Sequence, residues 1–190
     1  NASIDVDQRL YREDIAGSIA HAKMLGKKKI ISKKESEKLV FGLKSIQKDI
    51  EKNKVKFSRE LEDIHMNVES LLLNKIGKVA EKLHTARSRN DQVVTDLKLW
   101  IKNNSNELDK ELKNFQKTII GVSKKHINSI MPGYTHLQIA MPSSFGLWFS
   151  AYAECLIDDL YFWQSAYKIT DQNPLGSAAG YGSSFPIDPE

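Results

Sequence analysis

The sequence is short of cysteine, proline and glycine. Its 190 residues include one cysteine, five prolines and ten glycines. The lone cysteine, Cys155, excludes an internal disulfide and fits a reducing compartment, so we expect a cytoplasmic protein. Cys155 lies in a helical apolar pattern, which predicts a buried structural thiol rather than a nucleophile. The stretch from Val93 to Ile120 contains neither proline nor glycine, so a long helix can form there.

Long apolar runs and a secretion signal are also missing. No run approaches the roughly 18 residues of a membrane-spanning helix, and the start lacks the basic, apolar and small-residue segments of a signal peptide. The 41% hydrophobic and 27% charged residues predict a soluble globular protein without a membrane partner. The net charge of +4 comes largely from Lys27–Lys29 with Lys33 and Lys34. These lysines lack interleaved aromatics and arginines, so we interpret them as a solvated corner, with nucleic-acid binding as an alternative.

Helical spacing of apolar residues dominates the first 85 residues. It predicts helices over about 7–25, from Ser32 onward and over 64–76. Ser32 and Glu35 form a capping box. The second helix carries a stripe typical of a buried face, at Leu39, Leu43, Ile46 and Ile50. Residues 1–88 are therefore predicted to form a small helical N-terminal domain.

Two longer helical patterns follow. The first keeps one apolar face over about 35 residues, which corresponds to a helix roughly 50 Å long. The second runs from after Pro142 to about Asp171, and its aromatic residues lie on more than one face. Such helices exceed what a small globule can bury, so they indicate a helix bundle or an oligomer core. The fold class is predicted to be all-α, with residues 89–190 as the first, truncated part of a central bundle.

The chain ends in a Gly/Ser-rich stretch, 176–186, with no later helix to cover the long ones. We therefore expect an N-terminal piece of a longer protein, or a bundle completed by other chains.

Polar residues crowd against the start of the first long helix, at 84–92. The free N–H groups and the dipole of a helix N-terminus favour an anion. Arg87 and Arg89 add bidentate donors suited to a carboxylate or phosphate. This pattern indicates an anion site. The alternative is that Asn90 or Asp91 only caps the helix, with both arginines solvated.

A second polar segment, Pro132–Gln138, lies between the two long helical patterns. It offers a hydroxyl at Thr135, an imidazole at His136 and an amide at Gln138, a set suited to proton transfer beside a carboxylate. The alternative is a structural histidine in a turn. The five histidines are scattered without metal-ligand spacing, and no dinucleotide or catalytic-serine motif occurs. We expect neither a metal nor a cofactor.

Together, segments 83–93 and 133–138 resemble the argininosuccinate lyase family, a branch of the fumarase/aspartase superfamily. Segments 2–7 and 173–177 are similar to that family as well, so the resemblance runs through the whole chain in order. One departure is Ala86, which stands where the family usually has glycine. If that backbone needs a positive φ, alanine strains it.

The resemblance implies cofactor-free β-elimination of argininosuccinate to arginine and fumarate. It assigns His136 as the catalytic acid/base or proton relay. It also implies substrate-binding residues, which are Ser3, Ser88, Arg89, Asn90 and Thr135. The family's mobile serine-rich loop, with its Met-Pro-Lys-Asn pattern, is absent from these residues. Family active sites are shared between subunits of a homotetramer, so we expect no turnover by this piece alone.

Alternatives to this assignment remain. A sibling lyase would act on adenylosuccinate, aspartate or malate, although the Arg87–Asp91 run argues against it. A catalytically silent, crystallin-like scaffold would keep the bundle alone. Of the other histidines, His84 is interpreted as flanking the site and His65 as lying on a helix surface.

Overall fold

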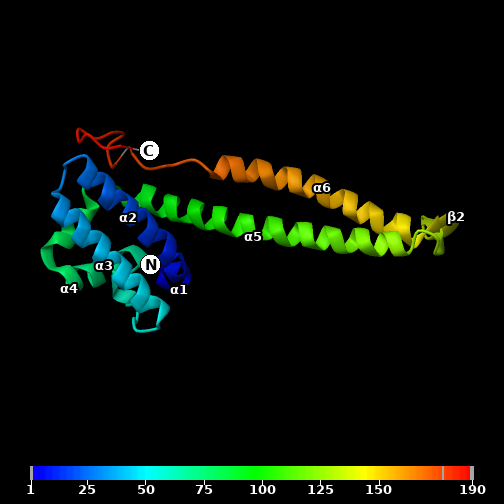
Figure 1. The fold of residues 1–190 in the computed structure, drawn as a ribbon, viewed down its shortest axis with the longest axis horizontal. Helices are drawn as coiled ribbons and strands as arrows, with labels where there is room; N and C mark the ends of the chain where they lie inside the picture. The colour runs from blue at the N-terminus through cyan, green and yellow to red at the C-terminus, as the bar shows by residue number, and fades with distance from the viewer. Residues whose placement is uncertain (1, 177, 189–190) are drawn as a thin grey trace. The chain divides into compact units, whose positions relative to one another are not determined.

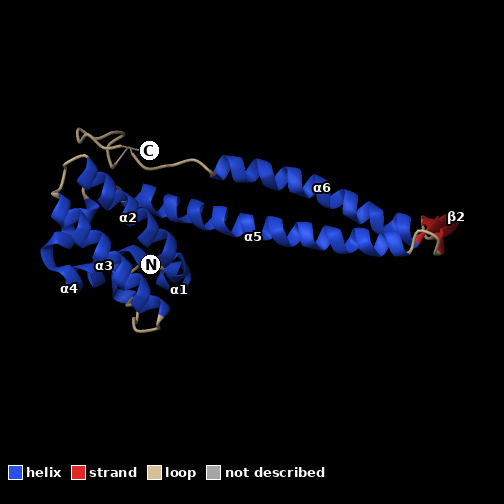
Figure 2. Cartoon of the chain, in the orientation of Figure 1, coloured by secondary structure: helices blue, strands red, loops and turns tan. Residues whose placement is uncertain are grey.

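The computed structural model describes residues 2–176 and 178–188. The chain forms two compact units, the first made of Asn1–Trp100 with Gln172–Glu190 and the second of Ile101–Asp171. Helices dominate both units, as Figures 1 and 2 show. The all-α prediction is confirmed, with one small sheet in addition.

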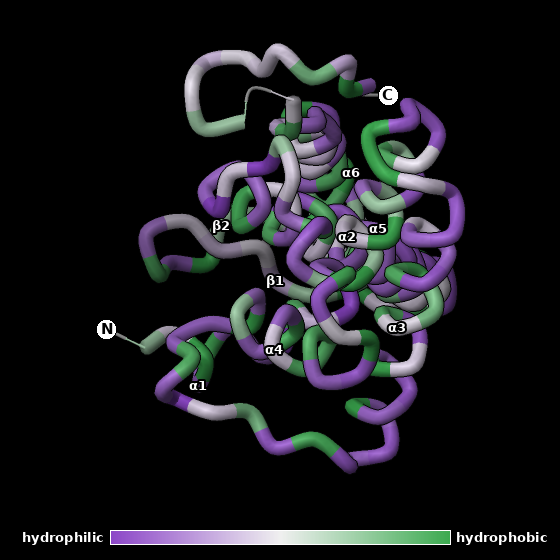
Figure 3. The backbone as a smooth tube through the Cα atoms, turned by 90° about the vertical axis from the view of Figure 1, so that its left-hand side faces the viewer, coloured by the Kyte–Doolittle hydropathy of each residue, from purple (hydrophilic) through white to green (hydrophobic). Residues whose placement is uncertain are grey.

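The first unit is a bundle of short helices. Its main helices are α2 (Tyr11–Lys27), α3 (Lys33–Glu51) and α4 (Ile64–Ile76), with the short α1 (Ile4–Asp7) before them. Three 3-10 segments connect them, η1 (Gln8–Leu10), η2 (Arg59–Leu61) and η3 (Gly77–His84). Hydrophobic and hydrophilic residues are mixed along these helices, as the tube in Figure 3 shows, and the apolar faces meet in one core.

Local sequence signals explain α3 and its packing. Ser32 caps the helix and forms the expected capping box with Glu35, which satisfies donors that the first turn cannot bond internally. The stripe begun by Leu39 and Leu43 lies in the core. Gly42 allows α4 to come close, because a Cβ there would meet Leu72 Cδ1 at 2.6 Å. The predicted buried face of α3 is therefore confirmed.

The second unit is built on two long helices. Helix α5 (Arg89–Lys125) begins in the first unit and continues into the second, and α6 (Phe145–Thr170) runs back beside it. Side chains of α5 and α6 bond to each other's backbone. Gln116 Nε2 donates to Ala153 O at 3.0 Å and Trp163 Nε1 to Ser105 O at 3.2 Å. Both long helices expected from the sequence are present.

A β-hairpin connects the two helices. Strands β1 (Ile130–Thr135) and β2 (Gln138–Ser144) pair antiparallel, with Pro132 opposite Pro142. We expected only a short connecting segment here. Because proline cannot donate to a ladder, its presence at both of these positions hid the strands.

Much of the second unit's apolar surface is uncovered. Ile119 and Ala153 are its buried hydrophobic residues within the described part of the chain. Cys155 is exposed, so the prediction of a buried thiol is wrong. Its helical pattern was read correctly, but no described element covers that face of α6.

Within the described ranges, no helix combines the length and apolar character that crossing a membrane requires.

Candidate functional site

The polar loop before α5 is held by a sharp turn and a cap. Ala86 has a φ of 56°, the left-handed region that disfavours a side chain. Ser88 then caps α5, because its Oγ accepts from the Asn90 N–H at 3.3 Å and its carbonyl accepts from the Gln92 N–H at 3.2 Å. The side chain that caps the helix is Ser88, rather than Asn90 or Asp91. Asn90 remains exposed at the helix N-terminus, where the backbone favours anions.

The two arginines of the loop have different surroundings. Arg89 is half-buried, pairs with Glu69 at 3.2 Å and donates to Gln92 Oε1 at 3.2 Å. His84 Nδ1 lies 3.4 Å from the same Glu69 carboxylate. Arg89 is thus oriented and still partly exposed. Arg87 is 6% exposed, and its Nη1 donates to Ser18 Oγ at 3.1 Å, so it faces the interior.

A buried ionic cluster lies behind this loop. His65 Nδ1 is 2.8 Å from Asp14 Oδ1 and 3.3 Å from Asp96 Oδ2. Gln92 donates to the same Asp14 oxygen. His65 is 2% exposed, so its assignment to a helix surface is wrong. It lies on the face of α4 that packs against α2 and α5.

The pKa values of the two carboxyl groups in this cluster are shifted in opposite directions. Burial alone raises the pKa of Asp14, but the hydrogen bond and charge of His65, the charge of Arg87 and the Gln92 amide outweigh it, and the net pKa is lowered. Burial and then the Asp14 charge raise the pKa of Asp96 to about 9. One ionised and one protonated carboxyl are what two close buried acids require.

Asp14, His65 and Asp96 offer ligand atoms within 4.8 Å of one another. However, the Gln92 amide occupies the Asp14 oxygen, and the Arg87 charge already acts on both carboxylates. We therefore interpret the cluster as an ionic network that ties α2, α4 and α5 together, rather than as a metal site. Sequence reasoning missed it because its members come from three separate helices.

Ser3 lies near the start of the chain, just before α1. Its Oγ donates to Asp7 Oδ2 at 2.7 Å and its N–H to Glu62 O at 2.9 Å. Ser3 is exposed. Ser3, Ser88, Arg89 and Asn90 all belong to the first unit, whereas Thr135 and His136 belong to the second.

Thr135 and His136 lie at the tip of the hairpin. Thr135 pairs with Gln138, so the loop has two residues, His136 and Leu137, with φ of 48° and 61°. Two positive φ values are the pattern of a type I′ turn, which usually uses Asn and Gly. Thr135 and His136 are exposed. Histidine is one of the non-glycine residues that occur more often at positive φ, so this turn is compatible with either a structural or a functional His136.

Comparison with known proteins places the chain among lyases. A family model described as "Lyase" matches residues 1–190. An argininosuccinate lyase of Ehrlichia ruminantium (strain Welgevonden) is 53% identical over 188 residues, which are 99% of this chain and 41% of that protein. One of Desulforamulus reducens is 50% identical over 190 residues, all of this chain and 41% of that protein. The chain thus spans about two fifths of these curated relatives' length.

Solved structures share the fold. EDDS lyase in complex with formate aligns with a TM-score of 0.87 at 24% identity, over 97% of this chain and 36% of that one. A fumarate lyase from Mesorhizobium sp. BNC1 aligns with a TM-score of 0.72 at 15% identity, over 88% of this chain and 41% of that one. The resemblance indicated by the motifs is confirmed.

Proposed function

The chain belongs to this lyase family, and we propose that the complete protein is an argininosuccinate lyase that releases fumarate and leaves arginine. The observation that carries the proposal is the pair of segments at 83–93 and 133–138. Each sits at a structurally special position, one capping the N-terminus of α5 and one at a strained hairpin tip. The identity of about 50% to curated argininosuccinate lyases supports it.

The loop at the start of α5 is proposed to bind the substrate's carboxylates. Removing a proton next to a carboxylate builds negative charge, which fixed donors must stabilise in the transition state. Ser88, Arg89 and Asn90 supply a hydroxyl, a guanidinium and an amide beside a helix N-terminus, which favours an anion. Arg89 is already oriented by Glu69, so little reorganisation is needed on binding.

The hairpin tip is proposed to handle protons. His136 acts as an acid/base or relay group, and the adjacent Thr135 hydroxyl helps to hold the substrate. An imidazole can exchange a proton near neutral pH, which is what protonation of a leaving nitrogen requires. The rigid two-residue turn positions the His136 backbone and leaves the ring accessible.

Ser3 is proposed to bind the arginine portion of the substrate, where its hydroxyl is oriented by Asp7. We further propose a cytoplasmic homotetramer whose subunits share active sites. One observation supports an assembly of several chains: α6 leaves aromatic side chains exposed, as is expected of a bundle that other chains complete. A single cysteine suits the reducing cytoplasm.

The test is fumarate formation from argininosuccinate by the complete protein, followed by ultraviolet absorbance. We expect His136→Asn to lower kcat by roughly 100-fold or more, the usual contribution of a general acid or base. The matched control is His126→Asn, which changes an exposed histidine bonded to Ser129 and should leave kcat within twofold.

Fumarate formed only from aspartate, adenylosuccinate or malate would transfer the assignment to a sibling lyase. No turnover of any of these substrates by a folded, assembled protein would favour a crystallin-like scaffold. Equal rates for wild type and His136→Asn would remove His136 from the mechanism while leaving the activity in place.

A further inference from the structure

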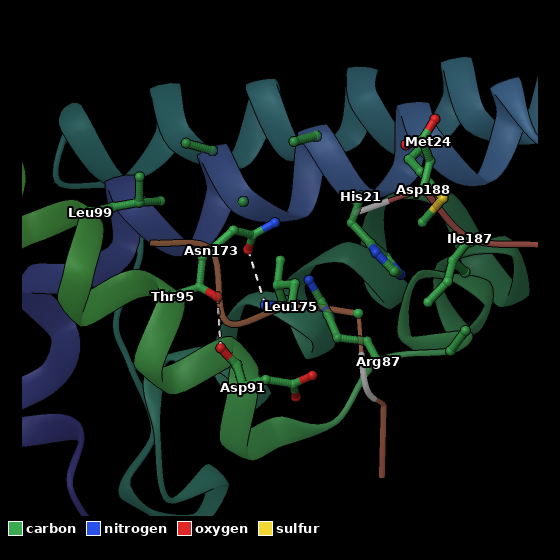
Figure 4. A pocket seen from close by; sticks show the side chains of 15 residues that line it. His21, Met24, Arg87, Asp91, Thr95, Leu99, Asn173, Leu175, Ile187 and Asp188 are labelled. Carbon is green, nitrogen blue, oxygen red and sulfur yellow. Dashed lines mark hydrogen bonds between the residues drawn. The ribbon is translucent and has the colours of Figure 1, made fainter. Parts of the chain in front are cut away.

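A cavity of about 350 Å³ lies in the first unit. It is bounded by α2, the start of α5 and residues of the segment after α6 (Figure 4). Its volume is at the lower end of the range for small-molecule sites. Ser88, Arg89 and Asn90 do not line it, whereas Arg87 and Asp91 of the same 84–92 segment do, so the cavity adjoins the proposed substrate-binding residues without including them. Its apolar wall is made by Ala16, Ala20, Met24, Leu99, Leu175 and Ile187.

A buried guanidinium with unused donors lines this cavity. Arg87 is 6% exposed, and its side chain extends among the lining residues in Figure 4. Nη1 is occupied by Ser18, whereas Nε and Nη2 are buried and have no hydrogen-bond partner within the described chain. Leaving such donors unbonded is costly. Two parallel N–H groups of an arginine match the two oxygens of a carboxylate.

A second buried polar group, the carboxylate of Asp91, lines the same cavity. Both oxygens of Asp91 are buried and lack a hydrogen-bond partner among the described residues. Asp91 lies in the first turn of α5, and Arg87 lies in the loop just before that helix. Its oxygens can only accept, so they require a donor such as an ammonium group.

The remaining polar lining supplies no competing cation. His21 Nε2 is 2.9 Å from Thr85 O, and burial followed by the Arg87 charge lowers the pKa of His21 to about 4. The ring is therefore neutral at pH 7, and its Nε2–H donates to the Thr85 carbonyl. Asp188 pairs with Lys27 and Lys28 at 3.5 and 3.0 Å. Arg87 thus supplies unused hydrogen-bond donors and Asp91 supplies unused acceptors, and both lie beside an apolar wall.

We propose that this cavity binds an aliphatic α-amino acid. Its carboxylate accepts from Arg87 Nε and Nη2, its ammonium donates to Asp91, and its side chain packs against the apolar wall. A zwitterion meets both buried groups at once without adding net charge to the site. An aliphatic side chain suits the methionine, leucine and isoleucine of the lining.

The test is calorimetric titration of the complete protein with L-leucine, which needs no enzymatic activity. We expect saturable binding of about one ligand per chain. Two analogues each lack one charged group, 4-methylpentanoate without the ammonium and 3-methylbutylamine without the carboxylate. Each should bind at least about tenfold more weakly, since a hydrogen bond to a charged group contributes more than 1.4 kcal/mol.

Variants locate the site. Asp91→Asn should weaken L-leucine binding at least about tenfold. Leu99→Trp should abolish it by filling the cavity, without touching the buried ionic cluster. The matched control, Leu97→Trp, changes an exposed residue of α5 outside the lining and should bind normally. Absence of binding to wild type, or equal binding by Leu99→Trp and wild type, would overturn the proposal. Neither outcome bears on fumarate release, which is measured separately.

Discussion

The two units have similar helices but differ in how much of them is covered. The first unit buries a continuous core that joins α2, α3, α4 and the end of η3. The second unit has long helices, yet large side chains such as Phe162 (78% exposed) and Tyr161 (65% exposed) face outward. Helix formation alone therefore does not distinguish a self-sufficient domain from a partner-dependent one. The arrangement of apolar residues around each helix does.

The apolar pattern explains the difference. Helix α3 carries most of its apolar residues on one stripe, which α2 and α4 cover together, and Phe41 is the large apolar residue that lies outside it. The aromatic residues of α6 lie on several sides, so the neighbouring α5 cannot cover them all. Large exposed apolar patches often mark interaction surfaces. We expect further helices, from other copies or from the rest of the protein, to pack on α6.

The largest predicted effect contrasts one apolar truncation in each unit. Leu43→Ala removes a fully buried side chain from the first core and should lower the free energy of unfolding by about 2–5 kcal/mol. Phe162→Ala in this chain should change it by less than about 0.5 kcal/mol, because surface substitutions rarely do more. Urea unfolding followed by far-ultraviolet circular dichroism measures both.

The same two variants, measured in the complete protein, test whether other helices cover α6. If other helices cover α6 there, the Phe162→Ala cost should rise to about 3–5 kcal/mol, while that of Leu43→Ala stays as before. If both variants lowered the free energy of unfolding of the present chain by similar amounts, the apolar side chains of the second unit would be covered after all.

Buried ionisable groups make the first unit the pH-sensitive one. Burial and the Arg87 charge lower the pKa of His21 to about 4, so between about pH 4 and 6.5 the unfolded chain binds the proton more readily. The contribution of His21 to the free energy of unfolding is therefore fully present above pH 6.5. It is lost as the pH falls toward 4, by up to roughly 3 kcal/mol. The difference between wild type and His21→Gln in urea unfolding at pH 7.5 and 4.5 isolates this contribution, because other groups titrate in both proteins.

The exposed His126 provides the matched control from the second unit. His126→Gln should leave the pH dependence of unfolding unchanged. If His21→Gln does the same, the buried histidine is not held neutral and the contrast between the units weakens.

Much of the fold could be predicted from the sequence, because capping and periodicity act locally. The Ser32–Glu35 box and both long helices were found in this way. The hairpin was not, because Pro132 and Pro142 lie opposite each other at positions where strands rarely have proline. The exposure of Cys155 was missed because a helical pattern shows which residues share a face, but not whether anything covers that face.

The same limit applies to the candidate site, where the sequence reveals residues that are close along the chain but not residues that only packing brings together. The loop at 84–92 and the segment at Thr135–His136 were identified from contiguous residues and from the family resemblance. The buried cluster was not, because Asp14 and His65 are 51 residues apart and meet only through packing of helices. Contacts between distant helices leave no short spacing that a single sequence can show. The roles of Ser3, Ser88, Arg89, Asn90, Thr135 and His136 in the reaction stay predictions.

The smallest predicted effect concerns backbone strain, which both units place beside candidate site residues. Ala86 and Leu137 have φ of 56° and 61°, where a side chain costs about 1–2 kcal/mol. Ala86→Gly should raise the free energy of unfolding by about 0.5–1 kcal/mol, because the strain removed exceeds the added chain entropy. The matched control, Ala20→Gly in α2, should instead lower it by about 1 kcal/mol. Since Ala86 lies two residues before Ser88, a stabilised Ala86→Gly variant with weaker argininosuccinate binding in the complete protein would mean that the strain helps to set the loop's geometry. Unchanged binding would mean that the strain is merely tolerated, and destabilisation by Ala86→Gly would contradict the left-handed turn itself.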